Sequence, residues 1–429
     1  MSTKKLRGYL FPNMLAMLGI SLYIIVDTYF IATYAGTDGI TALNLIIPVF
    51  SLIFAIGGML GNGAATAFSL EKAAPGGKAD DYFSVAVIVN LLVSVPLVIL
   101  GVFFPKEVIG FLGADDMITN VGRDYISTVL ICTPLYLVNS TCTAFVRNDG
   151  SPNIAMAATL ASSFFNVVFD YILIFLLDWG MFGAALATGI SPLISILVTL
   201  WHFLSKKNTI RFRLLWPKFK MVLRSCRLGV GYFVGEIAGG VTGFVFNTIL
   251  LGLSGNVAVA AYGIVCNVAV IGTAVFSGVA QGLQPMASEA QGAGDVDSRR
   301  AICRYAIKVV VWIAVGIVSS LLIFAPQVVA LFNSEKDMAM AALAVPNLQL
   351  YVLGFLPASI NIALCGYLGA IGRDRLCGIL SVCRGIVAIV FFAVVLSQVF
   401  GIFGVWIAYP VTELFTLVVA LIAIGKSGL

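Results

Sequence analysis

Long apolar stretches separated by short polar turns recur along the whole of the 429-residue chain. Each stretch has about 20 residues or more, the length that a helix needs to cross a ~30 Å hydrocarbon layer. The strict alternation of a membrane β-barrel is missing from the sequence, and the stretches are about twice as long as a barrel strand. The pattern predicts an all-α protein that crosses the membrane many times.

Twelve membrane-spanning helices are predicted. Their expected ranges are 10–35, 43–70, 82–104, 120–146, 154–177, 181–204, 225–252, 257–288, 302–325, 340–370, 376–399 and 402–425. The basic N-terminal segment precedes an apolar run that is too long for the core of a signal peptide, and no small-residue cleavage site follows it. We therefore expect the first span to be retained.

Composition supports a membrane protein. Hydrophobic residues make up 60% of the chain and charged residues only 10%, whereas a soluble domain carries about 25% charged residues. The mean hydropathy is +1.04. The eight cysteines lack any metal-ligand spacing and are expected to be packing residues. The single histidine, His202, lies at an inner helix end, which argues against a histidine-based proton relay or metal site.

Lysine and arginine are concentrated on one side of the predicted membrane, in the even-numbered turns and at both ends of the chain. These cations are Lys4, Lys5, Arg7, Lys72, Lys78, Arg147, the cluster from Lys206 to Arg227, Arg299, Arg300, Arg304, Arg373, Arg375 and Lys426. The opposite side has only Lys106, Arg123 and Lys336. By the positive-inside rule, we expect a multi-pass protein of the inner (plasma) membrane with both termini in the cytoplasm.

The basic stretch "SKKNTIRFRLLWPKFKMVLRSCR" lies halfway along the chain, on the predicted cytoplasmic side. It could be taken for a nucleic-acid patch, but its position favours a linker held at anionic headgroups, and no nucleic-acid partner is expected. The predicted organisation is an N-terminal lobe at 1–204, a cytoplasmic linker at 205–223 and a C-terminal lobe at 224–429.

The two halves of the chain repeat each other. "WGMFGAALATGIS" at 179–191 matches "FGIFGVWIAYPVT" at 400–412 with an offset of 221 residues, and the turn "PGGK" corresponds to "GAGD" with an offset of 217. Each half holds six spans, and an even number returns the chain to the same side. The repeats are therefore parallel, related by a pseudo-two-fold axis along the membrane normal, with a central cleft between two six-helix lobes.

Two carboxylates interrupt the apolar stretches of the first half. Asp27 lies in "SLYIIVDTYFIA" and Asp170 in "SSFFNVVFDYILIF". From the rise of a helix, both are expected roughly 12–13 Å below the outer surface. Asn166 is one helical turn from Asp170 on the same face. Thr188, on the next span, has roughly the same depth of 12 Å, so four oxygen-bearing side chains are expected to share one layer.

An ionised carboxylate in this layer costs about 2.5–3.5 kcal/mol or more, unless a proton or a hard cation neutralises it. The scaffold does not require these acids, because the repeat places Phe391 opposite Asp170 and Phe244 opposite Asp27. One structural alternative stays open. Asp170 could be permanently protonated and hydrogen-bonded to Asn166 and nearby hydroxyls.

The chain resembles the multidrug and toxic compound extrusion (MATE) transporters, in particular the prokaryotic branch with its ion site in the N-terminal lobe. The resemblance rests on "VDTYFIATYAG", "RNDGSPNIA", "NVVFDYILIF" followed by "WGMFGAALAT", "AVAAYGI", "GVAQGLQPMASEAQGAG" and "GIFGVWIAYPVTEL". It implies that the coupling residues are Asp27, Asn166, Asp170 and Thr188. It also implies a helix-1 hinge at Pro12. The second-lobe cation site of some relatives looks incomplete here, since the span at 340–370 has no acid.

Other polar residues have two interpretations. Arg384 and Glu413 lie at compatible depths on consecutive spans, and a structural ion pair is favoured over a transport role. Glu236 could attract a cationic substrate or could form structural hydrogen bonds. Helices 2 and 8 should line the cleft by symmetry. The weak candidates for its lining are Met59, Glu236, Gln281, Gln284 and Met286.

Three functions compete for this sequence. The favoured one is an H⁺- or Na⁺-coupled antiporter that exports amphipathic organic cations and drugs by alternating access. The alternative is a flippase for lipid-linked precursors, which should have a cationic cleft. An intramembrane enzyme is not expected, because no catalytic motif or nucleotide-binding motif is present. We expect a monomer in the lipid bilayer, with no cofactor beyond the coupling ion and no metal beyond Na⁺ at the coupling site.

Overall fold

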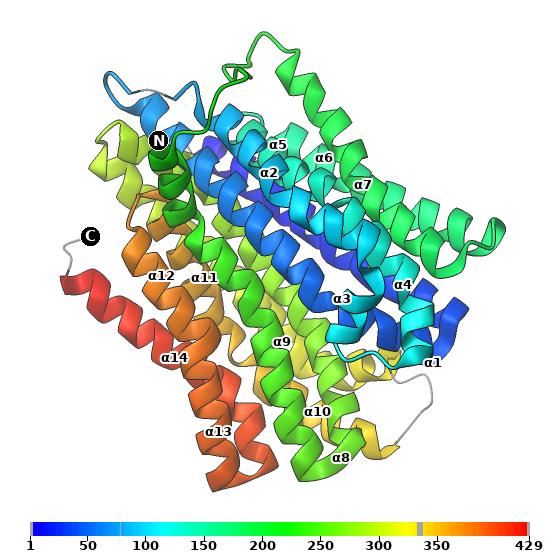
Figure 1. The fold of residues 1–429 in the computed structure, drawn as a ribbon. Helices are drawn as coiled ribbons and strands as arrows, with labels where there is room; N and C mark the ends of the chain where they lie inside the picture. Colours follow the sequence, from blue (N-terminus) through cyan, green and yellow to red (C-terminus); the bar gives the residue numbers. More distant parts are fainter. Residues whose placement is uncertain (1–2, 78, 333–337, 427–429) are drawn as a thin grey trace.

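The computed structural model describes residues 3–77, 79–332 and 338–426, and helices run through most of them (Figure 1). The first half contains α1 (Thr3–Ala73), α2 (Tyr82–Phe103), α3 (Pro105–Phe111), α4 (Asp116–Ile131), α5 (Thr133–Asn148), α6 (Pro152–Tyr171), the π-helical turn η1 (Ile172–Leu176) and α7 (Gly180–Phe203). The second half contains α8 (Phe219–Gly292), α9 (Val296–Phe332), α10 (Met338–Val352), α11 (Phe355–Ala370), α12 (Asp374–Val382), η2 (Cys383–Val387), α13 (Ala388–Phe400) and α14 (Ile402–Lys426).

Two very long helices, α1 and α8, each contain two membrane spans. α1 is broken at Gly36, with φ 58°, and α8 at Gly255, with φ 68°. Only glycine adopts such angles at little cost. The non-helical angles break the helix at these residues, and the chain reverses direction there. Within the described residues, ten helices are long and apolar enough to cross a membrane, and two bent pairs, α4 with α5 and α10 with α11, bring the number to twelve.

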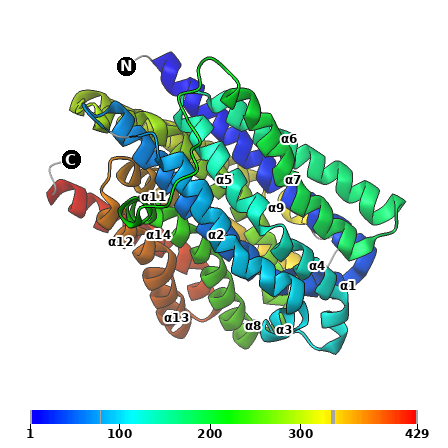
Figure 2. The same cartoon turned by 45° about the horizontal axis from the view of Figure 1, so that its top comes forward.

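Backbone breaks recur at matching places in the two halves. Glycines with positive φ pair as Gly36 with Gly255, Gly76 with Gly294, Gly150 with Gly372, and Gly180 with Gly401. These pairs are separated by between 218 and 222 residues. The two bent pairs of helices have the same angle, 46°. The repeat read from the sequence is therefore present in the backbone, and both termini emerge from the same end of the bundle (Figures 1 and 2). We call this end the terminus side.

Each half packs around its own apolar core. The largest core cluster belongs to α8–α14, and two smaller clusters fill the first half. At the terminus side the halves exchange residues: Leu6 and Leu10 of α1 join the core of the second half, while Leu228 of α8 joins a cluster of the first. The two halves are thus separate bodies that interlock at one end.

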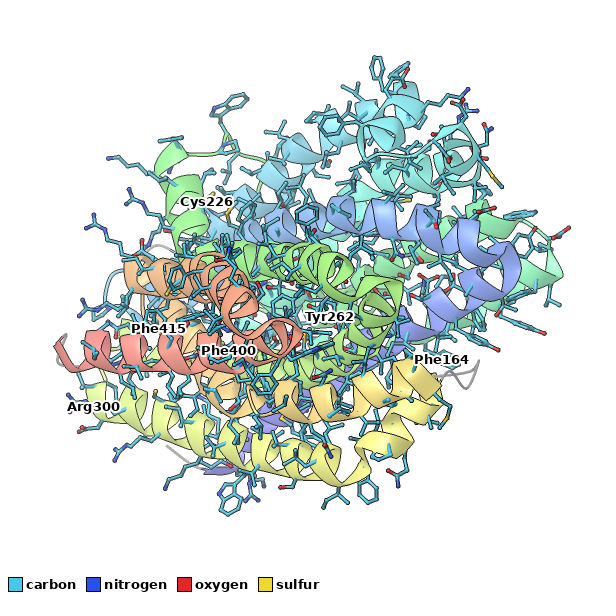
Figure 3. The ribbon with its side chains drawn as sticks, turned by 90° about the horizontal axis from the view of Figure 1, so that it is seen from below. Phe164, Cys226, Tyr262, Arg300, Phe400 and Phe415 are labelled. Atoms are coloured by element: carbon cyan, nitrogen blue, oxygen red, sulfur yellow. The ribbon has the colours of Figure 1, made fainter. Side chains whose placement is uncertain are left out.

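Large apolar side chains cover much of the outside of the bundle. Trp312 is 76% exposed and Phe164 is 73% exposed, and Phe164 projects at the rim of the molecule in Figure 3. A soluble protein rarely exposes so many such residues, whereas lipid tails solvate them. The surface is that of a multi-pass membrane protein. Of the cations used above to predict sidedness, Lys78 and Lys336 lie outside the described residues.

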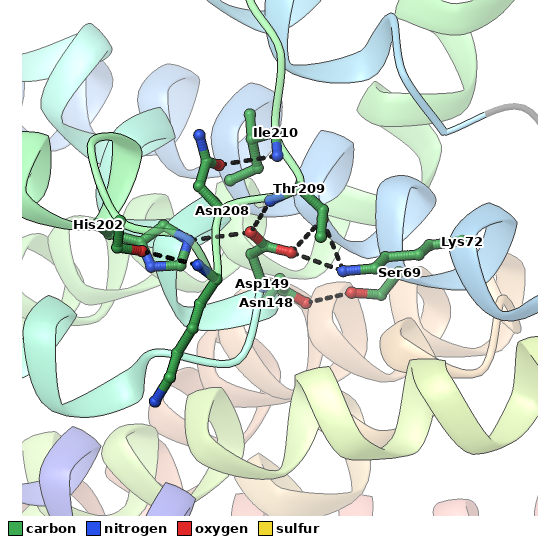
Figure 4. A network of polar contacts seen from close by, with 10 residues as sticks. Ser69, Lys72, Asn148, Asp149, His202, Asn208, Thr209 and Ile210 are labelled. Carbon is green, nitrogen blue, oxygen red and sulfur yellow. Dashed lines mark hydrogen bonds and ion pairs between the residues drawn. The ribbon is translucent and has the colours of Figure 1, made fainter.

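A non-helical segment, 204–218, connects α7 to α8 and lies on the first half (Figure 4). The buried carboxylate of Asp149 holds it, because Asp149 accepts hydrogen bonds from the Thr209 backbone N–H at 2.8 Å and from the Thr209 hydroxyl. Lys72 Nζ lies 2.6 Å from Asp149 Oδ1, and His202 Nε2 lies 2.9 Å from its Oδ2. The single histidine is therefore part of a structural network.

The pKa of Asp149 reflects these contacts. Burial raises it, but the hydrogen bonds from His202, Lys72 and Thr209 favour the ionised form and lower the pKa from 3.8 to about 2. Farther along the segment, the Arg213 backbone N–H donates to Ser84 Oγ at 2.8 Å. The segment is consequently fastened to the first half at two places.

Candidate functional site

The structure brings together the four oxygen-bearing residues predicted from depth. Asp27 lies on the first span of α1, Asn166 and Asp170 on α6, and Thr188 on α7. All four side chains are buried, and those of Asn166 and Asp170 are fully inaccessible. Three helices that are separate in sequence thus contribute to one polar cluster inside the first half.

Asn166 connects two of the three helices of this cluster, α6 and α7. With its amide nitrogen turned toward Asp170, Nδ2 donates to Asp170 Oδ2 at 3.2 Å. The amide oxygen then accepts from the Thr188 backbone N–H at 3.2 Å and from the Thr188 hydroxyl at 3.0 Å. This orientation satisfies both ends of the amide, which fixes α6 against α7 and positions the Asp170 carboxyl group.

The carboxyl groups of Asp27 and Asp170 lie within hydrogen-bond reach of each other. Two ionised carboxylates would repel at that separation, and a proton or a cation held between them would remove the repulsion. One oxygen of each acid, Oδ1, is buried and has no hydrogen-bond partner among the described residues. Buried oxygens without a donor are costly, and a proton or a hard cation at the acid pair would satisfy them.

Three tyrosines that the sequence argument missed lie near the acid pair. Tyr23 lies one turn before Asp27 on α1, while Tyr125 of α4 and Tyr136 of α5 approach from the bent pair. All three are close enough to interact electrostatically with the acids. The hydroxyl groups of Tyr125 and Tyr136 are buried and have no partner in the described part of the chain. The four-residue spacing between Tyr23 and Asp27 could have been recognised in the sequence, because it places both on one helix face. The bend between α4 and α5, which carry Tyr125 and Tyr136, could not.

Pro12 lies inside α1, and the helix continues through it. Among the residues described in α1, the non-helical position is Gly36. Proline removes a backbone hydrogen bond, so Pro12 is a weak point of the helix, although its backbone angles are helical in this conformation. The assignment of a hinge to Pro12 stays a prediction.

Arg147 joins the two halves at the terminus side. Its guanidinium donates to Asn13 Oδ1 at 3.0 Å, to Asn62 Oδ1 at 2.6 Å and to Gln281 Oε1 at 2.6 Å. Gln281 belongs to α8, whereas the other partners belong to α1. The sequence argument counted Arg147 among the cations of the predicted cytoplasmic side, and its side chain is only 6% exposed. Burial removes water from the guanidinium group, and the three amide oxygens accept hydrogen bonds in its place.

A second polar contact lies next to Arg147. Gln284 of α8 donates to the Asn62 carbonyl at 3.2 Å and to the Thr66 hydroxyl, and it accepts from the Tyr232 hydroxyl at 2.8 Å. Gln281 and Gln284, predicted as cleft-lining candidates, thus hold the halves together in this conformation. Whether they also meet substrate stays a prediction.

Helix backbones touch where the halves meet. An added Cβ atom would overlap the other half at several glycines, which pair as Gly63 with Ser225, Gly229 with Met59, Gly278 with Met14 and Gly292 with Leu70. Farther along α8, toward its break, Gly239, Gly240, Gly243 and Gly252 have no described neighbour within 4 Å of that position. The halves are therefore closed at the terminus side, with open space beside α8 beyond the contact.

The remaining cleft candidates differ in position. Met286 is buried in the core of the second half, and Met59 contacts Gly229 through its backbone. Glu236 is exposed on α8, between the closed region and the open face. It is the candidate that a ligand could reach directly in this conformation.

The second half contains a different polar cluster. Arg384 Nε donates to Glu413 Oε1 at 2.6 Å, which confirms the predicted ion pair. Asn361, which the sequence argument missed, donates to Glu413 Oε2 at 2.8 Å. At the positions that correspond to the acids of the first half, Phe244 and Phe391 are exposed. The charges here are mutually satisfied, in contrast to those of the first half.

Twelve spans in two repeated halves, with buried acids in one half, define a multi-pass membrane protein organised as a secondary transporter. The sequence model of the MatE family matches residues 12–172 and 236–395, and the chain belongs to this family. Membership confirms the expectation of a transporter rather than an enzyme.

Similar proteins include the multidrug export protein MepA of Staphylococcus saprophyticus, 29% identical over 402 residues that cover 92% of this chain and 87% of MepA. MepA of Staphylococcus haemolyticus is 27% identical over 411 residues, covering 94% and 88%. A solved outward-facing conformation of a multidrug resistance MATE family transporter has a TM-score of 0.91 at 23% identity, covering 98% of this chain and 94% of that one. The predicted fold of twelve helices in two lobes is confirmed.

Proposed function

We propose that this protein is an antiporter that exports amphipathic organic cations, drugs among them, in exchange for protons or sodium ions. Its relatives named as multidrug export proteins support the cargo class. The Lys and Arg distribution supports a plasma-membrane location with the terminus side in the cytoplasm. In this orientation the conformation described above is closed toward the cytoplasm.

In this proposal the acid pair couples drug transport to the ion gradient. The observation that supports this role is that one buried oxygen of each acid accepts no hydrogen bond from a described residue. Asp27 and Asp170 take up the coupling ion from outside, with Asn166 and Thr188 completing the oxygen shell. Ion binding removes the net negative charge of the cluster and so changes how the first span packs against α6.

The drug and the coupling ion are exchanged because both compete for the negative charge of the acid pair. A cationic drug and the coupling ion both compensate the acid pair, so each is released where the other is taken up. Loading the ion lets the first span bend near Pro12, which narrows the cleft beside the first half and releases the drug outward. Glu236, exposed on the opposite wall, attracts the cation from the second half.

The test is drug transport in proteoliposomes under a pH gradient and a sodium gradient, imposed separately. Asp170→Asn keeps nearly the same volume but cannot bind the ion, so we expect a folded protein with at least about a hundredfold lower gradient-driven transport, since a few kcal/mol of ion binding is lost. The matched control, Asp116→Asn, changes an exposed acid at the start of α4. Full transport by Asp170→Asn at the wild-type level of protein would refute the proposal. Transport without dependence on either gradient would also refute it.

A further inference from the structure

A cavity of about 440 Å³ opens at the terminus side between the two halves. Leu70, near the end of α1, lines it from the first half. The start of α8 and the turn before α12, through Gly372 and Asp374, line it from the second. It lies well away from the acid pair, and the proposed transport cycle makes no use of it. Its volume is that of a small-ligand pocket.

One face of α8 forms most of the wall. Its lining residues are Lys220, Leu223, Arg224, Arg227 and Leu228. Their spacing of three and four places them along a single helix stripe. Three cations and two leucines share this stripe, so the cavity offers positive charge and apolar contact together.

The positive charge is only partly compensated. Arg224 is ion-paired with Glu71 and also donates to the Tyr82 hydroxyl at 3.2 Å. Lys220 and Arg227 form no ion pair with any residue that the structure describes. The acid that lines the cavity is Asp374. A surplus of cations at a concave surface attracts an anion with more than one oxygen.

We propose that this cavity binds the phosphate headgroup of an anionic phospholipid. Lys220 and Arg227 hold the phosphate oxygens, and Leu70, Leu223 and Leu228 contact the first part of an acyl chain. A free phosphate offers the same charge but has no apolar part that could contact the three leucines. Basic pockets between membrane helices at the headgroup level are typical lipid sites. This binding goes beyond the proposed export function and does not depend on it. Because Leu70 belongs to the first half, the lipid would join the halves at their closed side.

The test is lipid binding to the full-length, detergent-purified protein, measured by native mass spectrometry with phosphatidylglycerol and with phosphatidylcholine as probes. The variant Lys220→Gln/Arg227→Gln removes both uncompensated cations. At about 1 kcal/mol per cation, we expect phosphatidylglycerol to bind roughly 25-fold more weakly to it. The control Lys206→Gln/Lys207→Gln removes two exposed cations of the connecting segment that do not line the cavity, and it should bind like wild type.

Three results would overturn the proposal. One is equal binding of the two lipids, and another is an equal loss in the test and control variants. The third is displacement of phosphatidylglycerol by inorganic phosphate at millimolar concentration, which would identify a free-phosphate site. If the variant does not fold, a photoreactive phosphatidylglycerol on the wild-type protein decides the question. Labelling must then map to residues 220–228 and 372–374, and labelling elsewhere would contradict the proposal.

Discussion

Individual charged residues in this protein fall into two chemical situations. Asp149 and Glu413 are buried but surrounded by donors, so each is a fixed part of the fold. Asp27 and Asp170 are buried with one oxygen each left unsatisfied. A fold gains nothing from an unsatisfied buried acid, and such groups are therefore the natural candidates for function.

Removing the charge of Glu413 tests the structural side of this division. Glu413→Gln leaves the partly buried Arg384 cation without its charged partner, and breaking a fully buried pair typically costs about 3–5 kcal/mol, so we expect a smaller loss here. We expect a lower yield of folded protein and a lower midpoint of thermal unfolding, measured by fluorescence-detected size exclusion in detergent. Transport per folded molecule should keep its dependence on the ion gradient. Normal stability with abolished transport would assign Glu413 to the mechanism instead.

Asp149 should make stability depend on pH in the acid range. Its folded pKa of about 2 lies below the unfolded value of 3.8, so the folded state is stabilised above pH 4 and loses that contribution as the pH falls toward 2. The contribution is about 2 kcal/mol. The Asp149→Asn variant should be less stable than wild type at pH 7, and the difference should shrink on acidification. A constant difference between the two melting temperatures across this range would contradict the assignment, and Asp116→Asn is the control.

The sequence predicted the membrane-spanning helices better than it predicted the bends within them. Apolar length placed all twelve spans, because crossing the membrane requires it. The repeat in the sequence marked the turns at Gly76/Gly294 and Gly180/Gly401, but not the breaks at Gly36/Gly255. Sequence length did not reveal that the spans at 120–146 and 340–370 are each bent by 46°. The first bend is near Pro134, in the first turn of α5, and proline permits a break without dictating its direction. The short helix α3 is too short for a periodicity signal.

Close helix crossings at the terminus side depend on glycine. A methyl group at Gly229 would overlap the Met59 backbone, whereas one at Gly235 on the same helix meets nothing within 4 Å. We expect Gly229→Ala to disfavour the conformation closed at this side, which would raise the labelling rate of a cysteine introduced at Ser225, and Gly235→Ala to leave that rate unchanged. Both replacements improve helix propensity by up to about 1 kcal/mol, so propensity cannot explain a difference between them. Equal labelling rates in the two variants would show that the crossing tolerates a side chain.

At the scale of the whole molecule, sequence reasoning predicted the halves but not the way they lock. Depth arguments gathered Asp27, Asn166, Asp170 and Thr188, because one helix rise fixes how far each lies from the surface. The contact of Arg147 with Asn13, Asn62 and Gln281 was not predictable in this way. It depends on the tilt and rotation of whole helices, which packing decides. Packing likewise decides the bend between α4 and α5, which carry Tyr125 and Tyr136.

The proposed exchange has an electrical consequence. An acid pair that shares one proton would carry a single negative charge, so one further H⁺ or Na⁺ would enter for each monovalent drug cation that leaves. No net charge crosses the membrane, and the membrane voltage, which supplies about 2.3 kcal/mol per charge at 100 mV, would contribute nothing. Export of a monovalent cation from proteoliposomes should be equally fast with and without an imposed potassium diffusion potential, while that of a divalent cation should be slowed by an inside-negative one. A voltage-dependent rate for the monovalent cation would mean that both carboxylates are emptied in each cycle.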